Sequence, residues 1–353
     1  MFVKNDKALE LSKYNLAQDD IILARRGDLS KCAIVTSKNV GWLCGTGSFV
    51  MHLCLIESYY FQYIYATQYM QNILNTASVG ATMDNLNQDT FSNILIPVPP
   101  LLEQKRIING IQKWYNLIDD IDANKNELYN LIEETKRKVI SQAIHGKLVP
   151  QDPNDEPAIE LLKRINPSFK PCDTSHYENL PETWCVAHMS EVYNHTTGKA
   201  LKKADITGEL RQYITTSNVY WNSFDFTEVR SMYFTEKELD KCTAHKGDLL
   251  VCNGGDVGRA AIWDYDYDIC YQNHISRLRP KSADIVFNPF YSYLFRYFKD
   301  KGQLNGKGVA ITSLSAADIQ SLAIPLPPLT EQKRIVERIE TIFAQLDTIT
   351  AEL

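Results

Sequence analysis

An internal repeat constrains this chain more than any other feature of its sequence. Residues Pro97 to Ile107 read PVPPLLEQKRI and residues Pro325 to Ile335 read PLPPLTEQKRI, with nine of eleven positions identical at an offset of 228. The offset continues upstream without a gap, so that Asp20 to Leu23 matches Asp248 to Val251. Gly27, Asp28 and Ile34 likewise match Gly255, Asp256 and Ile262. Chance does not produce such identity, so one module occurs twice.

Short strands and a helix are expected in each module. Asp248 to Val251, the turn residues Asn253 to Asp256, and Arg259 to Trp263 predict a strand, a tight turn and a second strand. Ser292 to Phe298 carries Tyr, Leu and Phe at helical spacing and is expected to cover the sheet. The module is therefore predicted to be α+β.

A heptad pattern follows the proline-rich turn in both copies. Pro100 and Pro328 are suited to the first turn of a helix, and Gly146 is suited to its end. From Leu101 to His145 the first helix is expected to be about 68 Å long, at about 1.5 Å per residue. Such a helix either spaces two modules or forms a dimerisation coiled coil. The predicted seam consists of Ile107, Ile111, Trp114, Ile118, Ile121, Leu128, Ile132, Val139, Ile335, Ile339, Ile342, Leu346 and Ile349.

Composition limits the remaining possibilities. A chain of 353 residues that is 44% hydrophobic can bury more than one core. Its net charge of −6 argues against non-specific coating of nucleic acid, which requires clustered Lys and Arg. The eight cysteines contain no CxxC pair, so reduced thiols are expected and neither a metal nor a cofactor. Because no signal peptide or long apolar run is present, a cytoplasmic protein is expected.

Three segments of the chain resemble the DNA-specificity subunit of type I restriction–modification systems. They are the twice-used proline-rich motif, Ile140 to Leu162 (ISQAIHGKLVPQDPNDEPAIELL) and Leu180 to Trp184 (LPETW). The resemblance covers essentially the whole chain. It implies an α+β fold in which two target recognition domains, the first incomplete, are separated by long antiparallel coiled-coil helices. It also implies double-stranded DNA, two methyltransferase subunits and, in the nuclease form, restriction subunits as partners, with no catalysis by this chain.

The repeat and the resemblance together predict five segments. The second module begins near Leu180, whose counterpart at the same offset would precede residue 1, so the first domain is expected to be incomplete. The counterpart of Leu353 is Lys125, so a shorter distal helix is expected, with self-association through the helices. The segments are a partial first recognition domain (1–98), a central spacer helix (99–146), a linker (147–179), a second recognition domain (180–326) and a distal helix (327–353).

Residues for DNA contact are predicted mainly in the second module, since direct readout needs paired donors and acceptors at the major groove. The stretch Thr196 to Asn218 is the main candidate, and a solvated strand and loop face is its alternative interpretation. Loops with glycines, which let the backbone approach phosphates, add further candidates, as does the corresponding loop of the first module. The candidates are Thr197, Lys199, Lys202, Lys203, Arg211, Tyr213, Thr215, Thr216, Asn218, Asn253, Arg259, Lys307, Arg25, Arg26 and Lys31. His274 is expected to be structural.

Two other classes of function remain open from the sequence. An adenine methyltransferase needs an Asn-Pro-Pro-Tyr-like loop, whereas Asn288 to Tyr291 lacks the second proline. The glycines of Gly45 to Phe49 are weak evidence for a cofactor loop. The other class is a decoy or silent cassette that binds methyltransferase subunits without binding DNA, which the repeat and the heptads do not exclude.

Overall fold

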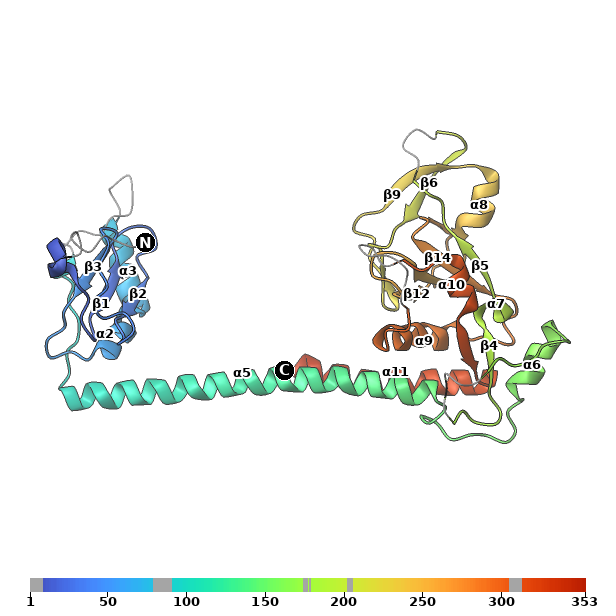
Figure 1. Cartoon of the computed structure of the whole chain (residues 1–353), viewed down its shortest axis with the longest axis horizontal. Coiled ribbons are helices and arrows are strands. Elements are labelled where there is room, and N and C mark those ends of the chain that lie inside the picture. The colour runs from blue at the N-terminus through green and yellow to red at the C-terminus, as the bar shows by residue number, and fades with distance from the viewer. Residues whose placement is uncertain (1–8, 79–90, 174–176, 178, 202–205, 305–312) are drawn as a thin grey trace. The chain divides into compact units, whose positions relative to one another are not determined.

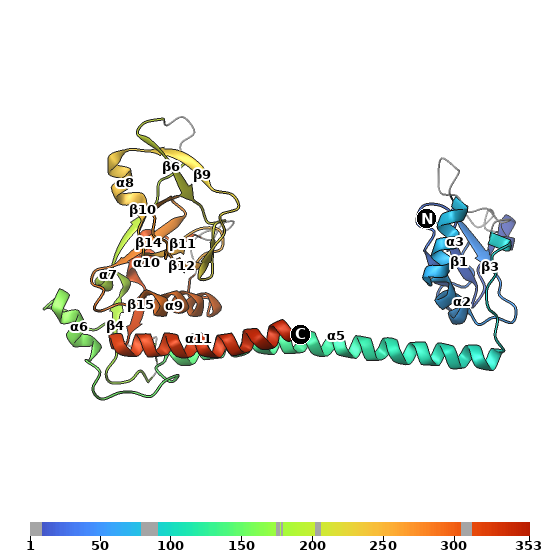
Figure 2. The ribbon, with the colours of Figure 1, turned by 180° about the vertical axis from the view of Figure 1, so that it is seen from behind.

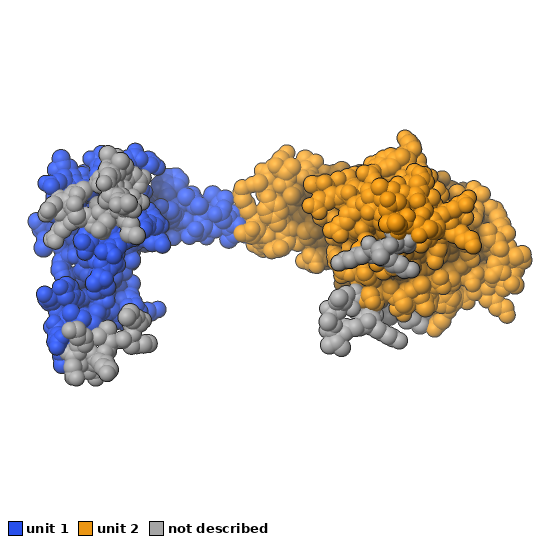
Figure 3. All heavy atoms as spheres, turned by 90° about the horizontal axis from the view of Figure 1, so that it is seen from above, with its two compact units in different colours: residues 1–124 blue, residues 125–353 orange. Residues whose placement is uncertain are grey.

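A computed structural model describes residues 9–78, 91–173, 177, 179–201, 206–304 and 313–353. The chain divides into two compact units, Met1–Asn124 and Lys125–Leu353, coloured blue and orange in Figure 3. Both units combine strands with helices, so the predicted α+β class is confirmed. None of the helices in the described ranges is long and apolar enough to cross a membrane.

The first unit is built on a three-stranded antiparallel sheet with the order β2-β1-β3 (Figure 1). Its elements are a 3-10 helix (Ser12–Tyr14), β1 (Ile21–Ala24), β2 (Cys32–Ile34), β3 (Ser48–Met51), α2 (Ser58–Tyr65), α3 (Gln68–Ser78) and the start of α5 (Leu101–Ile144). Alternation along β1 directs Ile21 and Leu23 to the same face, where they pack with Phe61 and Tyr65 of α2. The sheet and α2 therefore share one core.

The second unit contains two four-stranded sheets, ordered β12-β11-β14-β5 and β10-β13-β6-β9. The strands are β5 (Tyr193–Thr197), β6 (Glu209–Ile214), β9 (Arg230–Phe234), β10 (Thr243–Ala244), β11 (Leu249–Cys252), β12 (Ala260–Ile262), β13 (Ile269–Tyr271) and β14 (Ile275–Pro280). Leu249 and Val251 face a core under α9 (Asn288–Asp300), whereas Leu250 and Cys252 face a second core that includes Ile214 of β6. Because both faces of the first sheet are covered, every residue of β11 is buried.

Smaller elements complete the second unit. They are α6 (Ala158–Ile165), β4 (Cys185–His188), α7 (Met189–Val192), β7 (Val219–Tyr220), β8 (Ser223–Phe224), α8 (Glu236–Cys242), α10 (Ala316–Ser321), β15 (Ala323–Leu326) and α11 (Leu329–Glu352). Strand β15 pairs with β4. In the first unit no described segment pairs with the corresponding residues 95–98, which form no strand. Helix α9 packs against α11, and both views of the ribbon show it between the sheets and that helix (Figures 1 and 2).

The strands obey the predicted offset, but the helices do not. The order β12-β11-β14 repeats β2-β1-β3, and β11 and β12 begin 228 residues after β1 and β2. Helix α9, however, begins 230 residues after α2. The expectation of an offset without a gap is therefore wrong between the last strand and the helix. The second copy has two extra residues there, and α9 runs unbroken where α2 and α3 are separate.

Gly146 ends the central helix as predicted. It has a φ of +66°, and its N–H donates to the carbonyl of Ala143, while Lys147 N–H donates to the carbonyl of Gln142. These two bonds form a Schellman motif, which satisfies carbonyls at the end of a helix. Pro181 and Trp184 pack against Gly146, so the end of α5 also contacts the LPETW segment.

The repeated EQKRI motif joins each module to its own helix. In the second unit, the amide of Gln332 is fully buried, accepts from Phe287 N–H at 2.7 Å and donates to the carbonyls of Ile285 and Pro327, both at 2.9 Å. In the first unit, Gln104 makes the corresponding bonds to Glu57 N–H (2.8 Å) and to the carbonyls of Leu55 (3.0 Å) and Pro99 (2.8 Å). We call this buried amide and its three partners the glutamine joint.

Further contacts of the motif occur only in the second unit among the described residues. Trp184 Nε1 donates to Glu331 at 2.9 Å, and Arg334 forms an ion pair with Asp155 at 2.6 Å. These contacts bring together the three segments on which the sequence resemblance rests. In the first unit, the counterparts Glu103 and Arg106 are exposed. The glutamine joint is thus the part of the attachment that both copies share.

The heptad seam is covered along α11 and uncovered along the first half of α5. Lys136 on α5 lies 2.7 Å from Asp347 of α11, and Lys125 contacts the Leu353 carbonyl, so the two segments run antiparallel. Ile132, Ile335 and Ile339 are buried, whereas Trp114, Ile118 and Ile121 are 68%, 50% and 47% exposed. Ile107, Ile111, Leu128, Val139, Ile342 and Leu346 are half-buried and Ile349 is exposed.

Candidate nucleic-acid interface

Lys199 is engaged inside the second unit. Its side chain is only 5% exposed, and Nζ donates to Glu238 at 2.8 Å and to the Tyr233 carbonyl at 2.7 Å. The hydrogen bond from Lys199 lowers the pKa of the Glu238 carboxyl below its usual range. The position of Lys199 contradicts its prediction as a free DNA-contacting cation, because a buried, paired charge does not reach a phosphate.

Three other candidates of the stretch Thr196 to Asn218 also serve the fold. Tyr213 is buried in a small core with Phe234. Asn218 is buried and closes a turn: its Oδ1 accepts from Thr215 N–H at 2.8 Å, and its Nδ2 donates to the carbonyls of Asp225 and Glu228. Tyr213, Thr215 and Asn218 are therefore corrected from reading residues to structural ones.

Asn253 and Arg259 are held in a similar way. Asn253 is buried and donates to Ser276 Oγ at 2.9 Å, while its carbonyl accepts from Leu314 N–H. Arg259 donates to the Thr216 carbonyl and lies over the ring of Tyr220, with its side chain 16% exposed. Both residues position the loop between β11 and β12, and neither presents a free side chain to DNA.

Arg211 is the predicted residue that the structure leaves most available. Strand β6 pairs with β13 only at Tyr213 and Ile214, so residues 209–212 pair with β9 alone and form a two-stranded ribbon. Arg211 is 52% exposed on this ribbon and lies 2.9 Å from Glu209. Figure 1 places β6 and β9 at the end of the second unit away from α11. A two-stranded ribbon has dimensions that fit the major groove.

The ribbon also carries exposed residues that the sequence reasoning did not select. Gln212 lies opposite Ser231, and Arg230 lies opposite Tyr213. Gln212, Ser231 and Arg230 are all exposed. Arg and Gln are the side chains that make paired hydrogen bonds to base edges. Their alternating polar pattern was available from the sequence, but the pairing of β6 with β9 was not.

A cluster of turns lies at the same sheet ends. The Asn253 N–H donates to the His274 carbonyl, and Asn273 N–H donates to the Lys199 carbonyl. Lys299 and Arg259 both pair with Asp256. The exposed or half-exposed polar side chains here belong to Thr216, Ser217, Asp256, Gln272, Asn273 and His274. Thr216 thus stays a candidate contact, and Thr197 is half-buried at the end of β5.

The remaining candidates fall in the first unit or outside the described residues. Arg25 lies over the ring of Phe49, while Arg26 and Lys31 are exposed near Asp28. Lys31 is 4.0 Å from Asp28. Lys202, Lys203 and Lys307 lie outside the described residues. No contact brings Arg25, Arg26 and Lys31 to one point, so they remain separate predicted phosphate contacts.

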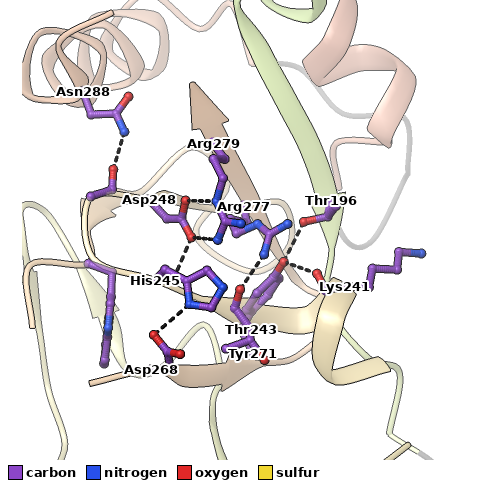
Figure 4. A network of polar contacts seen from close by, with 12 residues as sticks. Thr196, Lys241, Thr243, His245, Asp248, Asp268, Tyr271, Arg277, Arg279 and Asn288 are labelled. Carbon is purple, nitrogen blue, oxygen red and sulfur yellow. Dashed lines mark hydrogen bonds and ion pairs between the residues drawn. The ribbon is translucent and has the colours of Figure 1, made fainter. Parts of the chain in front are cut away.

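A buried polar network fixes the two sheets of the second unit to one another (Figure 4). Arg279 forms a two-bond ion pair with Asp248 at 2.6 and 2.7 Å. Tyr271 of the other sheet meets Thr196 of β5 at 2.7 Å, and burial raises the pKa of its hydroxyl to about 12. Arg277, buried between the sheets, donates to the Thr243 carbonyl. The network orients the sheet that carries the ribbon.

The residues considered for catalysis are also engaged in the fold. Asn288 is buried, accepts from Tyr193 at 2.7 Å and donates to the Gly247 carbonyl at 2.5 Å. Its amide is therefore not free to hold a base. Among the residues that the structure describes, no group of three or more His, Cys, Asp or Glu could hold a metal ion.

Comparison with known proteins supplies the context for this geometry. A family described as "Type I restriction modification DNA specificity domain" matches residues 3–130 and 181–353. The chain is 24% identical to the EcoKI specificity subunit of Escherichia coli (strain K12), over 100% of this chain and 73% of that protein. It is 25% identical to the EcoBI specificity subunit of Escherichia coli, over 79% of this chain and 57% of that protein.

Solved structures show the same fold. The HsdS subunit from Thermoanaerobacter tengcongensis matches with a TM-score of 0.60 and 20% identity, over 96% of this chain and 76% of that one. A chain from a study of complex assembly and conformational transition of the type I R-M system matches with a TM-score of 0.65 and 19% identity, over 96% and 77%.

Proposed function

The chain belongs to the family of type I restriction–modification DNA specificity domains, and from this premise we propose that it reads a bipartite DNA site for methyltransferase and restriction subunits. Each module reads one half of the site, and the chain itself performs no chemistry. The proposed partners are double-stranded DNA, two methyltransferase subunits and, in a nuclease form, restriction subunits. The complex acts in the cytoplasm, where its DNA lies.

The glutamine joint is the observation that carries the proposal. Two copies of one sheet are each attached to the start of a helix by the same buried amide, at Gln104 and Gln332. A duplicated module fixed to a helix suits a ligand that is itself repeated at a distance. A split DNA site is such a ligand, and the spacer between its halves is then set by the helices.

The second module carries the proposed reading surface. Arg211, Gln212 and Arg230 on the β6–β9 ribbon supply donors that can pair with base edges, while Thr216 and the turn cluster contact the backbone. In the first module, Arg26 and Lys31 contact phosphates. The domain ranges proposed from the sequence, 1–98 and 180–326, remain the assignment of the two readers.

Association through helices is part of the proposal. Trp114, Ile118 and Ile121 correspond, 228 residues earlier, to Ile342, Leu346 and Ile349 of α11, which lie along the seam facing α5. Exposed apolar stripes of this kind mark interaction sites. A helix of a second copy, or of a methyltransferase subunit, is the proposed cover.

Selection from a random duplex library tests the function. The purified chain is incubated with the methyltransferase subunit and the library at defined salt, and bound duplexes are sequenced. We expect enrichment of two short motifs at a fixed separation. A complex that forms but enriches no motif would identify the chain as the decoy that only occupies methyltransferase subunits.

A further inference from the structure

A surface pocket of about 570 Å³ lies in the second unit where α9, α11 and the β11–β12 sheet meet. Its apolar wall is formed by Ile262, Val286, Phe287 and Tyr293. Asn222 and Asn288 also line it, but their amides are engaged with Ser292 and with the Gly247 carbonyl. The pocket is therefore apolar in its walls, and its neutral polar groups are already hydrogen-bonded.

The charged side chains that line the pocket are both acidic. Glu340 comes from α11 and Asp264 from the turn after β12. Glu340 lies close enough to Tyr293 to contribute, after burial, to raising the pKa of that hydroxyl to about 12. Lys246 is 3.9 Å from Asp264 but only 2.7 Å from Asp266, which is its closer partner. A pocket with two carboxylates repels phosphate, so DNA is not its occupant.

An arginine or lysine side chain of another protein fits these features. Such side chains bury an apolar stem and keep a cationic head at the edge of the contact. Here the stem would lie along Ile262 and Tyr293, and the head would meet Glu340 and Asp264. Buried Arg anchors are prominent among the residues that dominate protein interfaces.

The first unit does not repeat the two charges. At the offset of 228, the counterpart of Asp264 is Thr36 and that of Glu340 is Gln112. The pocket is therefore an attribute of the second module alone. A partner that binds both modules would meet an acidic pocket at one of them and neutral side chains at the other.

We propose that this pocket anchors an arginine or lysine of the methyltransferase subunit that packs along α11. The inference rests on the proposed function for the identity of the partner. It adds a place and a chemistry for the contact, on a part of the module distinct from the β6–β9 ribbon. It also makes the two methyltransferase positions unequal, since only the second module offers the pocket.

Binding of the purified methyltransferase subunit to variants of the full chain tests the proposal. Glu340→Lys reverses a pocket charge, and Ala283→Trp fills the pocket from an exposed position on its rim without changing charge. Glu337→Lys is the matched control, because it makes the same change on α11 at an exposed residue that does not line the pocket. We expect both pocket variants to weaken binding at least tenfold and the control to stay within twofold.

Each other outcome has a defined meaning. If wild type and both pocket variants bind the methyltransferase subunit equally, the pocket proposal is wrong and the proposed function stands. If wild type does not bind that subunit at all, the proposed partner fails, and the anchor fails with it. A photo-crosslinking residue at position 283 that captures a second copy of this chain, in place of the methyltransferase, also overturns the proposal. Thermal unfolding verifies that each variant is folded.

Discussion

At the scale of residues, Arg211 separates reading from structural roles. It is exposed on a two-stranded ribbon, whereas its neighbours Tyr213 and Thr215 are buried. We expect Arg211→Ala to weaken binding to the selected DNA site by about 1 to 3 kcal/mol and to relax one base position. Arg164→Ala, on the exposed surface of α6, is the control. Fluorescence anisotropy with specific and random duplexes measures both, and an equal loss on the two duplexes would remove Arg211 from the readers.

Lys202 is expected to behave differently from Arg211. It lies outside the described residues, and we predict from the sequence that it contacts a phosphate. Lys202→Ala should then weaken all duplexes alike and reduce the dependence of log K on log salt by about one unit. A titration of binding against salt concentration checks this, and sequence-dependent loss would contradict it.

His195 makes stability depend on pH. Its Nε2 lies 3.0 Å from Ser276 Oγ, and burial, followed by the charge of Lys241, lowers its pKa below the ordinary value of 6.5. The unfolded chain therefore takes up the proton first as pH falls. The free energy of unfolding should be full above about pH 6.5 and decrease below it. Urea denaturation across pH 5 to 8 measures the slope.

A variant isolates this contribution. His195→Gln should flatten the slope between about pH 5 and 6.5, whereas His274→Gln, at an exposed position, should leave it unchanged. The carboxyls of Asp155 and Glu238 have lowered pKa values through their cationic partners, and they contribute at lower pH. An unaltered slope in His195→Gln would assign the effect to another group.

At the scale of elements, two glycines of α5 should respond oppositely to the same substitution. Gly146 has positive φ, and an added Cβ would lie 2.5 Å from Pro181 Cγ. Gly146→Ala should lower the free energy of unfolding by about 1 to 2 kcal/mol or more. Gly110 lies within the helix with open space around its Cβ position, so Gly110→Ala should stabilise by about 0.5 to 1 kcal/mol. Denaturant unfolding of both variants compares the signs.

Elements with local signals could be predicted from the sequence, and the roles of single side chains could not. The turn residues around Gly255 and the heptads after Pro328 gave β11, β12 and α11 because such patterns act within a few residues. Lys199 was assigned to DNA because its partner Glu238 lies 39 positions away and on another element. The ribbon was missed for the same reason, since β6 and β9 meet only through long-range pairing.

The gap between α2 and α3 also escaped prediction. Equal offsets on both sides concealed the two residues that the second copy gains before α9 and loses again before the proline-rich motif. Identical helix starts at Leu101 and Leu329 restored the register. Sequence offsets record the sum of insertions and deletions, whereas hydrogen bonds of the glutamine joint locate them.

At the scale of the whole molecule, the proposed spacer can be lengthened. Inserting one heptad into α5 keeps the apolar seam and adds about 10 Å, at about 1.5 Å per residue. The unread gap of the selected DNA site should grow by about three base pairs, at about 3.4 Å each, with both half-sites unchanged. Library selection with the inserted variant measures the gap, and an unchanged gap would reject the spacer role.

Association of the chain should depend on the exposed half of the seam. Ile118→Lys places a charge on a residue that is 50% exposed, and it should shift the chain toward monomer. Sedimentation velocity over a range of concentrations measures this. Ile132→Lys tests another property, because Ile132 is buried and its change should destabilise the second unit itself. A wild-type chain that stays monomeric throughout would rule out self-association.

The glutamine joint also has a genetic consequence. Because Gln104 and Gln332 make corresponding bonds, and the residues around them are encoded twice, the gene contains two interchangeable crossover points. Recombination between them would delete 228 codons in frame and leave one module attached to one helix by an intact buried amide. Recombination with another gene at the same point would exchange a reader and leave its attachment unchanged.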